Sequence, residues 1–391
     1  MNPSAYLIRI GEITLKKRNR SRFLNALVQA IRQRLAGLEF HLEPRHKKLL
    51  LQCSAAPDLI QSRLSTVFGI TGISPIWKCA LDLEAIQNLS WSLCQDKRQS
   101  AKDFGVRVRR NNKNFPIKSM DCQAQIGSFL LKNGLNLPVN LKSPDLAINV
   151  SLEFKEAWVW TETWPGRGGL PQVGDSRHLL LLSGGIDSPV AGNLIQKRGG
   201  TLAAVYFHTP PYTLDAAKEK AIDLAHVLAG FQVQLDLYIV PITRIMKRLL
   251  SDCDNGYSVV LARRFMMRIA TRLAEQHGYH ALVTGENLGQ VASQTIQNIH
   301  CINEGVPLPI LRPLIGLDKL EIVGLAEKLG SFEISIRPHQ DCCSLFAPED
   351  PVTKATLTRI RSMEEPLPIV DMVEEALAET EVQTIRPQII H

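Results

Sequence analysis

The chain has 391 residues, of which 45% are hydrophobic and 21% charged, a composition typical of a globular protein with two or three domains. Its formal net charge of +7 favours polyanionic partners, although many basic proteins bind no nucleic acid. No apolar run approaches the length of a membrane span, and the N-terminus lacks the apolar stretch of a signal peptide. Eight cysteines without any CxxC pair argue against a disulfide scaffold, a zinc ribbon and the simplest iron–sulfur spacing, so we expect a cytoplasmic protein with no membrane partner.

The first segment, residues 1–57, combines short strands with one amphipathic helix. Residues 5–10, 40–43 and 49–53 have the pattern of strands. Between the first two, large apolar residues recur every four positions, as on one face of a helix: Phe23, Leu27, Ile31 and Leu35. The side chains before and at the start of this helix are basic, which indicates either contact with nucleic acid or a solvated helix entry: Lys16, Lys17, Arg18, Arg20 and Arg22.

The second segment, residues 58–163, contains a basic strand. Residues 104–110 alternate apolar with basic side chains, which is typical of a half-buried strand with a cationic outer face. Either these cations bind RNA phosphates or they are merely solvated: Arg107, Arg109, Arg110, Lys113 and Lys118. Around this strand the sequence predicts helices over 58–64, 86–93 and 122–133, a strand over 76–79, and a closing hairpin of strands over 146–154 and 157–161.

Residues 164–177 begin with Gly- and Pro-rich sequence and read as a linker to a third segment, 178–391. There, predicted strands and helices alternate, which favours an α/β fold with a doubly wound parallel sheet. Ligands of such sheets bind at the carboxyl ends of the strands. The predicted strands are 179–182, 202–207, 232–240 and 281–284, the predicted helices are 215–229, 242–250, 259–277 and a last one over 318–329, and an acidic helix-like tail lies around 371–381.

The stretch from His178 to Gly200 organises this third segment. Four leucines form an apolar strand, a Ser-Gly-Gly turn follows, and Ser188 and Pro189 are suited to cap and open a helix. Glycines allow close approach of an anion, and a helix N-terminus supplies free N–H groups. The stretch SGGIDS resembles the PP-loop of the ATP pyrophosphatase superfamily, and the alternative is an ordinary tight turn between strand and helix.

The second segment resembles a THUMP domain, and a ferredoxin-like piece, a THUMP domain and a PP-loop domain in that order resemble the tRNA 4-thiouridine synthetase family. Four further stretches carry this resemblance: FHTPPYT (207–213), LARRFMMRIA (261–270), LVTGENLGQVASQT (282–295) and ILRPLIGLDKLEI (310–322). The resemblance implies an enzyme that adenylates a uridine of tRNA with ATP and replaces its 4-oxygen with sulfur. It also implies sulfur supply for the thiamine thiazole ring.

The resemblance also implies a set of site residues. Asp187 in the loop would either hold Mg²⁺ against the phosphates, orient the substrate or cap the helix. The adjacent thiols Cys342 and Cys343 would handle sulfur, with Cys343 preferred, and their alternative role is that of inert buried thiols. ATP would be bound by Leu181, Leu182, Ser183, Gly184, Gly185, Asp187, Ser188, Tyr206, Phe207, Arg263, Gly285 and Gln294.

Long members of this family end in a rhodanese domain, for which this chain has no room after its acidic tail, so it resembles the short form. We therefore expect sulfur to come from a cysteine desulfurase or another persulfide carrier, and a homodimer is compatible with one tRNA lying across two subunits. Two rival interpretations are another RNA-adenylating enzyme of the PP-loop class and an inactive RNA-binding protein. Pyrophosphate exchange with ATP separates the enzymes from an inactive binder.

Overall fold

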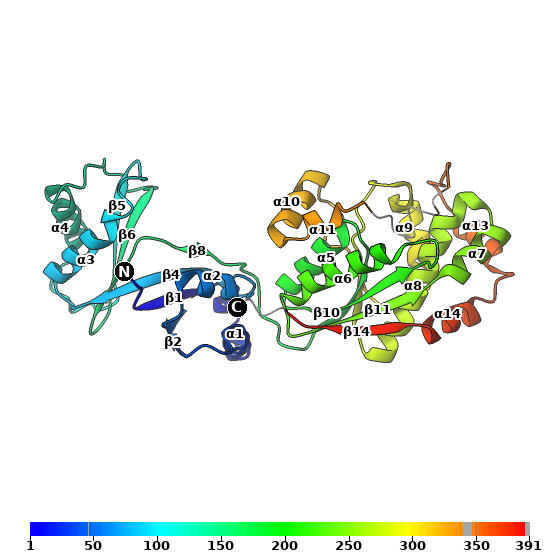
Figure 1. Cartoon of the computed structure of the whole chain (residues 1–391), viewed down its shortest axis with the longest axis horizontal. Coiled ribbons are helices and arrows are strands. Elements are labelled where there is room, and N and C mark those ends of the chain that lie inside the picture. Colours follow the sequence, from blue (N-terminus) through cyan, green and yellow to red (C-terminus); the bar gives the residue numbers. More distant parts are fainter. Residues whose placement is uncertain (46, 339–345, 347, 388–391) are drawn as a thin grey trace. The chain divides into compact units, whose positions relative to one another are not determined.

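The computed structural model describes all residues except 46, 339–345, 347 and 388–391. The chain divides into two compact units, Met1–Gly169 and a second unit that begins at Leu170 (Figure 1). Within the described residues, no helix combines the length and the apolar character needed to cross a membrane.

The first unit is built on one sheet in the order β2-β3-β1-β4-β7-β6-β5, with the short β8 paired to β4. Its first half has the βαββαβ order of a ferredoxin-like fold. The elements are β1 (Ala5–Ile10), η1 (Glu12–Leu15), α1 (Arg20–Arg34), β2 (Phe40–Arg45), β3 (Lys48–Cys53), α2 (Pro57–Leu64), β4 (Ile70–Cys79), α3 (Leu83–Gln95), β5 (Phe104–Arg110), α4 (Ser119–Lys132), β6 (Leu146–Leu152), β7 (Ala157–Trp160) and β8 (Trp164–Pro165).

Strand β4 is longer than the sequence pattern predicts, and it is shared by both halves of the first unit. From Ile70 to Ile76 it pairs antiparallel with β1, and from Trp77 to Cys79 it pairs antiparallel with β7. The two halves therefore form one continuous sheet without a gap. The predicted linker also takes part, because Trp164 and Pro165 pair with β4.

The second unit contains a six-stranded sheet in the order β13-β12-β9-β10-β11-β14. Five strands are parallel, which confirms the predicted α/β class, and β14 adds an antiparallel edge. The chain leaves β9 towards β10 and β11 and later returns to its other side with β12, so the strand order reverses between β9 and β12. The strands are β9 (Arg177–Leu182), β10 (Thr201–His208), β11 (Leu235–Pro241), β12 (Ala281–Val283), β13 (Ile310–Leu311) and β14 (Glu381–Ile385).

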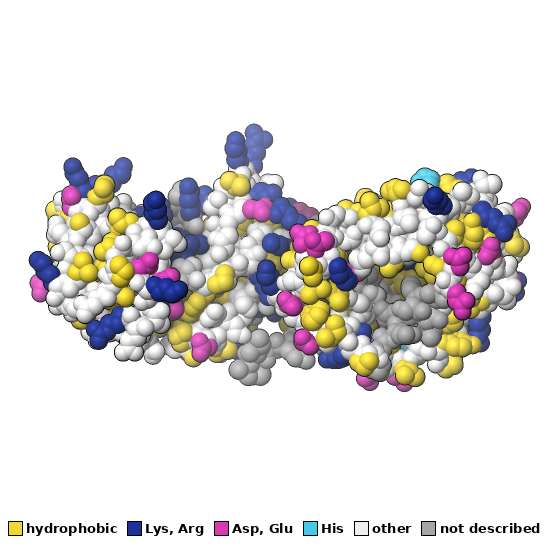
Figure 2. Space-filling model, turned by 90° about the horizontal axis from the view of Figure 1, so that it is seen from above, with side chains coloured by type: hydrophobic (Ala, Val, Ile, Leu, Met, Phe, Trp, Pro, Cys, Tyr) yellow, Lys and Arg dark blue, Asp and Glu magenta, His cyan; other side chains and the backbone are white. Residues whose placement is uncertain are grey.

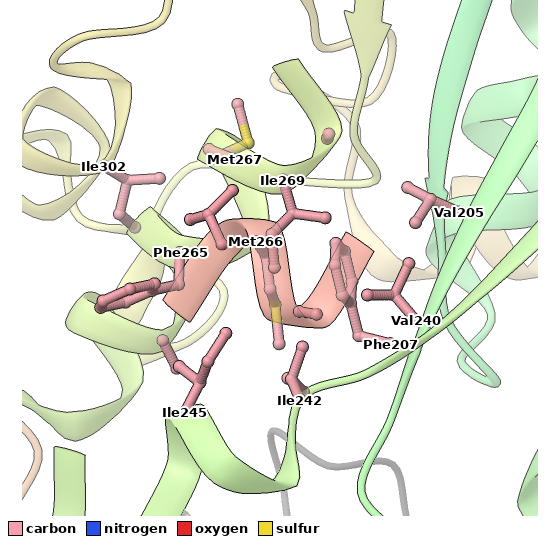
Figure 3. Close-up of a cluster of buried hydrophobic side chains, with 14 of the residues drawn as sticks. Val205, Phe207, Val240, Ile242, Ile245, Phe265, Met266, Met267, Ile269 and Ile302 are labelled. Atoms are coloured by element: carbon pink, nitrogen blue, oxygen red, sulfur yellow. The ribbon is translucent and has the colours of Figure 1, made fainter. Parts of the chain in front are cut away.

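Helices cover both faces of this sheet (Figure 1). Helices α7 and α8 close one face over a core that includes Phe207, Ile245 and Phe265 (Figure 3), and α5, α6, α10 and α11 pack together elsewhere in the unit. The helices are α5 (Asp187–Lys197), α6 (Asp215–Ala229), α7 (Thr243–Asp252), η2 (Asn255–Tyr257), α8 (Ser258–His277), η3 (Ala292–Gln294), α9 (Ile296–Asn303), α10 (Lys319–Leu329), α11 (Phe332–Ser335), α13 (Leu357–Glu364) and α14 (Ile369–Ala378).

The predicted helix over 318–329 is confirmed as α10, but it is not the last helix, because α11, α13 and α14 follow. The acidic tail forms α14 and then strand β14, and the pairing of β14 with β11 was not predicted. Strand β14 is a short edge strand with mostly exposed polar side chains, so it carries little apolar alternation that a pattern could detect.

Candidate adenylation site and nucleic-acid surface

The loop after β9 is held in shape by two serines. The backbone N–H of Ser183 donates to Oγ of Ser188 (2.9 Å), and the Ser188 hydroxyl lies 3.1 Å from the Ser183 hydroxyl. Ser188 is buried inside the first turn of α5, which begins at Asp187, so its predicted role as the helix cap is wrong. Its hydroxyl faces back to the start of the loop and fixes the turn between strand and helix.

Gly285, which follows β12, lies directly against this loop. A Cβ atom built at Gly285 would lie 2.7 Å from the backbone nitrogen of Ser188 and 2.9 Å from the carbonyl carbon of Asp187. Only a residue without a side chain allows this approach. The two segments meet where the strand order reverses, which is the usual position of a ligand in a doubly wound sheet.

A cavity of about 220 Å³ opens at this place. Eleven of the twelve residues predicted to bind ATP line it, and Gly184 is the exception. The predicted lining residues are Leu181, Leu182, Ser183, Gly185, Asp187, Ser188, Tyr206, Phe207, Arg263, Gly285 and Gln294, and the sequence analysis missed Met266, Met267, Thr284, Glu286 and Ile302. Four of the missed residues lie in stretches that carried the family resemblance, so the stretches pointed to them, whereas Ile302 had no such signal.

Arg263 reaches the cavity from α8 and is fixed there by an acidic partner. Its Nη1 lies 2.8 Å from Oε1 of Glu286, and Nε of Arg312 lies 2.7 Å from the other oxygen of the same carboxylate. Thr284 donates a further hydrogen bond to Glu286. One buried carboxylate therefore forms ion pairs with two guanidinium groups. This cluster keeps one net positive charge, which suits a polyphosphate.

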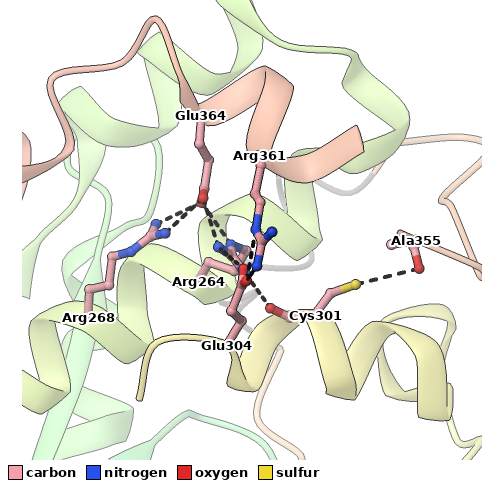
Figure 4. Close-up of polar contacts among 7 residues, drawn as sticks. All are labelled: Arg264, Arg268, Cys301, Glu304, Ala355, Arg361 and Glu364. Atoms are coloured by element: carbon pink, nitrogen blue, oxygen red, sulfur yellow. Dashed lines mark hydrogen bonds and ion pairs between the residues drawn. The ribbon is translucent and has the colours of Figure 1, made fainter. Parts of the chain in front are cut away.

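A second buried ion-pair network anchors α8 behind the cavity (Figure 4). Glu364 of α13 accepts hydrogen bonds from Arg264 and Arg268 at 2.7–2.8 Å, and Arg264 also donates to Glu304 at 3.0 Å. Burial alone would raise the pKa of Glu364, but the two arginines outweigh it and lower the pKa to about 2. Helix α8 carries Arg263 beside Arg264, so this network fixes the helix that brings Arg263 to the cavity.

Asp187, the acid of the loop, is held by two side chains from other segments. Its Oδ1 lies 2.6 Å from Nζ of Lys319 at the start of α10, and its Oδ2 accepts a hydrogen bond from Gln290 (3.0 Å). The sequence analysis did not select Lys319 or Gln290, although both lie in stretches that carried the resemblance. The carboxylate lies in the first turn of α5, whose N-cap is Ile186, so the alternative role of Asp187 as the helix cap is wrong. Holding Mg²⁺ and orienting the substrate stay predictions.

A single carboxylate beside a phosphate-binding loop fits Mg²⁺, which proteins usually hold with one or two carboxylates together with substrate phosphates. Among the described residues, no group of three or more His, Cys, Asp or Glu side chains lies close enough to hold a metal ion by itself. Asp187 is therefore the residue that would hold Mg²⁺, and the metal would neutralise charge on the phosphates.

Cys342 and Cys343 lie outside the described residues. Two thiols of the second unit are described, and burial raises the pKa of both, Cys253 and Cys301. Burial likewise raises the pKa of Cys79 to about 11 and of Cys94 to about 12. A thiol with a raised pKa forms little thiolate, the nucleophilic species, at neutral pH.

In the first unit, Arg107 and Arg109 line a basic groove with cations from β1 and the β2–β3 hairpin. Figure 2 shows Lys and Arg side chains standing out from the surface of this unit. Exposed Phe154 lies beside the groove, and Glu153 is its acidic member, paired with Lys48 at 3.1 Å. The cations that line the groove are Arg9, Arg45, Lys47, Lys48, Arg107 and Arg109.

The other predicted RNA-binding cations have different surroundings. Arg110 is half-buried and donates to the backbone carbonyls of Phe115 and Ile117, so its guanidinium shapes the following loop. Lys113 and Lys118 are exposed but do not line the groove. Among the basic residues near α1, Lys16 lies over the ring of Phe23, 5.3 Å from its centre.

The comparisons with known proteins match each of these parts. A family model described as "Thiamine biosynthesis protein (ThiI)" matches residues 174–369, a ThiI ferredoxin-like domain matches 5–74, and a THUMP domain matches 82–162. A probable tRNA sulfurtransferase of Moorella thermoacetica is 40% identical, and the alignment covers 98% of each chain. The chain belongs to the tRNA sulfurtransferase family.

Other members of the tRNA sulfurtransferase family agree over the same length. A probable tRNA sulfurtransferase of Staphylococcus aureus is 38% identical over 97% of this chain and 94% of its own. A crystal structure of a 4-thiouridine synthetase–RNA complex with bound ATP is 33% identical and has a TM-score of 0.87. The match covers 98% of this chain and 100% of that chain. The resemblance drawn from the sequence is thereby confirmed.

Proposed function

We propose that this tRNA sulfurtransferase uses ATP to replace the 4-oxygen of a uridine in tRNA with sulfur. The observation that carries the proposal is the cavity at the carboxyl ends of β9 and β12, in a chain that aligns over nearly its full length with proteins named for this activity. The family model's description also supports a contribution to sulfur supply for thiamine. Because the substrate is tRNA, we propose that the protein acts in the cytoplasm.

ATP would lie across the cavity with its phosphates at the Ser183–Ser188 loop. The strand-end residues Leu182, Tyr206 and Phe207 offer apolar contacts for the nucleoside, while Arg263 faces the phosphates. The uridine 4-oxygen attacks the α-phosphorus, the bond to the bridging oxygen breaks, and pyrophosphate leaves. The loop's backbone N–H groups and the helix dipole of α5 stabilise negative charge as it shifts to the leaving group.

Lys319 and Asp187 would act together at the reacting phosphate. With ATP present, the ammonium of Lys319 can bridge the carboxylate and a phosphate oxygen, since it lies 2.6 Å from Asp187. Asp187 would then bind Mg²⁺ with its remaining lone pairs and orient the substrate. Their proximity explains why an acidic residue is tolerated beside a triphosphate.

The second half of the reaction needs a sulfur nucleophile, and Cys342 and Cys343 are the proposed thiols, with Cys343 preferred. A cysteine desulfurase or another carrier would deliver sulfur as a persulfide. The terminal sulfur attacks C4 of the adenylated uracil, and AMP leaves. A second thiol then attacks the cysteine sulfur of the remaining S–S bond, which releases 4-thiouridine and leaves a disulfide that a cellular thiol reductant must reduce.

The RNA would bind the first unit through the groove cations, with Arg107 and Arg109 as the predicted members. Lys113, Lys118 and Arg110 complete the proposed set, the last by shaping the loop. Phosphate contacts of this kind give affinity and register without reading sequence. A homodimer in which one tRNA lies across two subunits stays a prediction.

The test is pyrophosphate release from ATP in the presence of unmodified tRNA. We expect release that depends on tRNA and that is lost in Asp187→Ala, while the affinity for tRNA stays nearly unchanged. An inactive RNA-binding protein would still shift tRNA on a gel but release no pyrophosphate. Release without any thiolated nucleoside would favour another adenylating reaction on RNA.

A further inference from the structure

Four large apolar side chains are exposed on the two segments that supply the partners of Asp187, the loop after β12 and the segment that leads into α10. Leu288 is 52% exposed, Val291 48%, Ile315 39% and Leu320 81%. Single exposed apolar residues are normal on a protein surface, but grouped ones mark interaction sites. We call these four residues the collar.

The collar residues belong to segments that are tied to the reactive carboxylate and to one another. Leu288 and Val291 flank Gln290, whose side chain donates to Asp187. The backbone N–H of Leu288 donates to the carbonyl of Ile315 (3.2 Å), which joins this loop to the segment before α10.

Leu320 follows Lys319, the second partner of Asp187. The loop is held further by a hydrogen bond from the side chain of Asn287 to the carbonyl of Leu317. Exposed apolar side chains therefore stand on both segments that bring an ammonium and an amide to the carboxylate of Asp187.

A nucleobase has the matching chemistry, because its two faces are apolar and its edge carries donors and acceptors. The reacting oxygen must reach the α-phosphorus beside the loop, so a base paired or stacked within folded RNA must first leave its stack. Enzymes that act on such bases cover the faces with apolar side chains and bind the edge with polar groups.

We propose that the collar receives the unstacked uracil, with Leu288, Val291, Ile315 and Leu320 against its faces and Gln290 at its edge. This inference rests on the proposed function. The collar binds the base only after ATP and RNA are in place, so it contributes to turnover and leaves the affinity for the rest of the tRNA to the groove of the first unit. A docking site for a sulfur-donor protein is the other occupant that the test distinguishes.

The experiment compares Leu288→Ser, Val291→Ser and the double variant with wild type, using the full chain. The matched control is Val382→Ser, since Val382 is 54% exposed on β14 at the far edge of the sheet. Each protein is assayed for tRNA-dependent pyrophosphate release, for ATP and tRNA affinity, and for thiolation with either sulfide or a desulfurase with cysteine.

We expect the double variant to lower kcat for pyrophosphate release about 10- to 100-fold, the range of losing a few apolar contacts to a substrate, with both affinities within about twofold of wild type. Leu288→Met, which keeps an apolar side chain at this position, should release pyrophosphate at close to the wild-type rate. Three results would overturn the collar proposal. They are unchanged pyrophosphate release by the double variant, a thiolation defect seen only with the desulfurase, and a loss of ATP binding. If wild type releases no pyrophosphate, the proposed function and the collar proposal both fail. If wild type releases pyrophosphate and the double variant releases it equally fast, only the collar proposal fails.

A second measurement does not depend on turnover or on the variants. 4-Thiouridine, the expected product, forms covalent crosslinks to adjacent side chains under long-wavelength ultraviolet light. Wild-type protein with bound product tRNA should crosslink to peptides that contain residues 288–291 or 315–320. Crosslinks confined to other peptides would contradict the proposal.

Discussion

Removing the charge of Glu364 should destabilise the second unit strongly, because this buried carboxylate forms ion pairs with two arginines at once. Arg264 is only 4% exposed, and in Glu364→Gln it keeps Glu304 as its remaining acidic partner (Figure 4). The ordinary glutamate pKa of 4.5 and the folded pKa of about 2 differ by about 2.5. At about 1.4 kcal/mol for each pKa unit, the ionised carboxylate contributes about 3 kcal/mol to folding. Breaking one side of a buried ion pair costs a similar ~3–5 kcal/mol.

The assay is urea denaturation of the full chain at pH 7, and Glu374→Gln is the control. Glu374 makes a comparable ion pair with Arg272, but both side chains are about half exposed, at 46% and 48%. Exposed pairs contribute at most ~1 kcal/mol, so the control should unfold close to wild type. Equal effects of the two substitutions would refute the reasoning.

The same network predicts how the difference in unfolding free energy between wild type and Glu364→Gln depends on pH. The pKa of Glu364 is lowered by folding, so its stabilisation is fully present above the unfolded pKa of about 4.5 and is lost as pH falls towards about 2. The gap between wild type and Glu364→Gln should therefore shrink between these values. A gap that stays constant down to pH 3 would show that the lost stability has another cause.

Three further substitutions test the site and the groove. Gly285→Ala should abolish measurable ATP binding because its Cβ meets Ser188, whereas Gly324→Ala, whose Cβ has open space, should leave binding unchanged in the same dialysis assay. Lys319→Ala should lower tRNA-dependent pyrophosphate release at least about 100-fold with unchanged tRNA affinity, and near-normal release would remove Lys319 from the site. Replacing Arg107 and Arg109 together by Glu should reduce the slope of log affinity for tRNA against log salt by about 2, and an unchanged slope would place the RNA surface elsewhere.

The sequence predicted the second unit well where local pattern and chemistry coincide. The leucine run of β9, the glycines after it and the alternation of strands and helices all depend on neighbouring residues, and these predictions held. The cavity could be anticipated because carboxyl ends of parallel strands converge, and residues as distant as Ser183 and Gly285 line it together.

Other features depend on contacts between distant segments, which no local pattern contains. The pairing of Glu286 with Arg263 and Arg312, and of Asp187 with Lys319, joins segments that are far apart in the chain. Ser188 was misassigned because a serine before a helix usually caps it. Here the helix starts at Asp187, one residue before Ser188, and the Ser188 hydroxyl closes the loop. The strand pattern likewise did not contain the hydrogen bonds of Arg110 to backbone carbonyls of the following loop, and its part in RNA binding stays a prediction.

The central claim is best tested by incubating unmodified tRNA with the protein, ATP and Mg²⁺, and analysing the nucleosides by mass spectrometry. Sulfide serves as the sulfur source in one reaction, and a cysteine desulfurase with cysteine in the other, each with wild type, Cys342→Ser and Cys343→Ser. The account predicts 4-thiouridine from wild type in both reactions, and a cysteine variant that fails only with the desulfurase. Absence of 4-thiouridine from wild type under both conditions would contradict it.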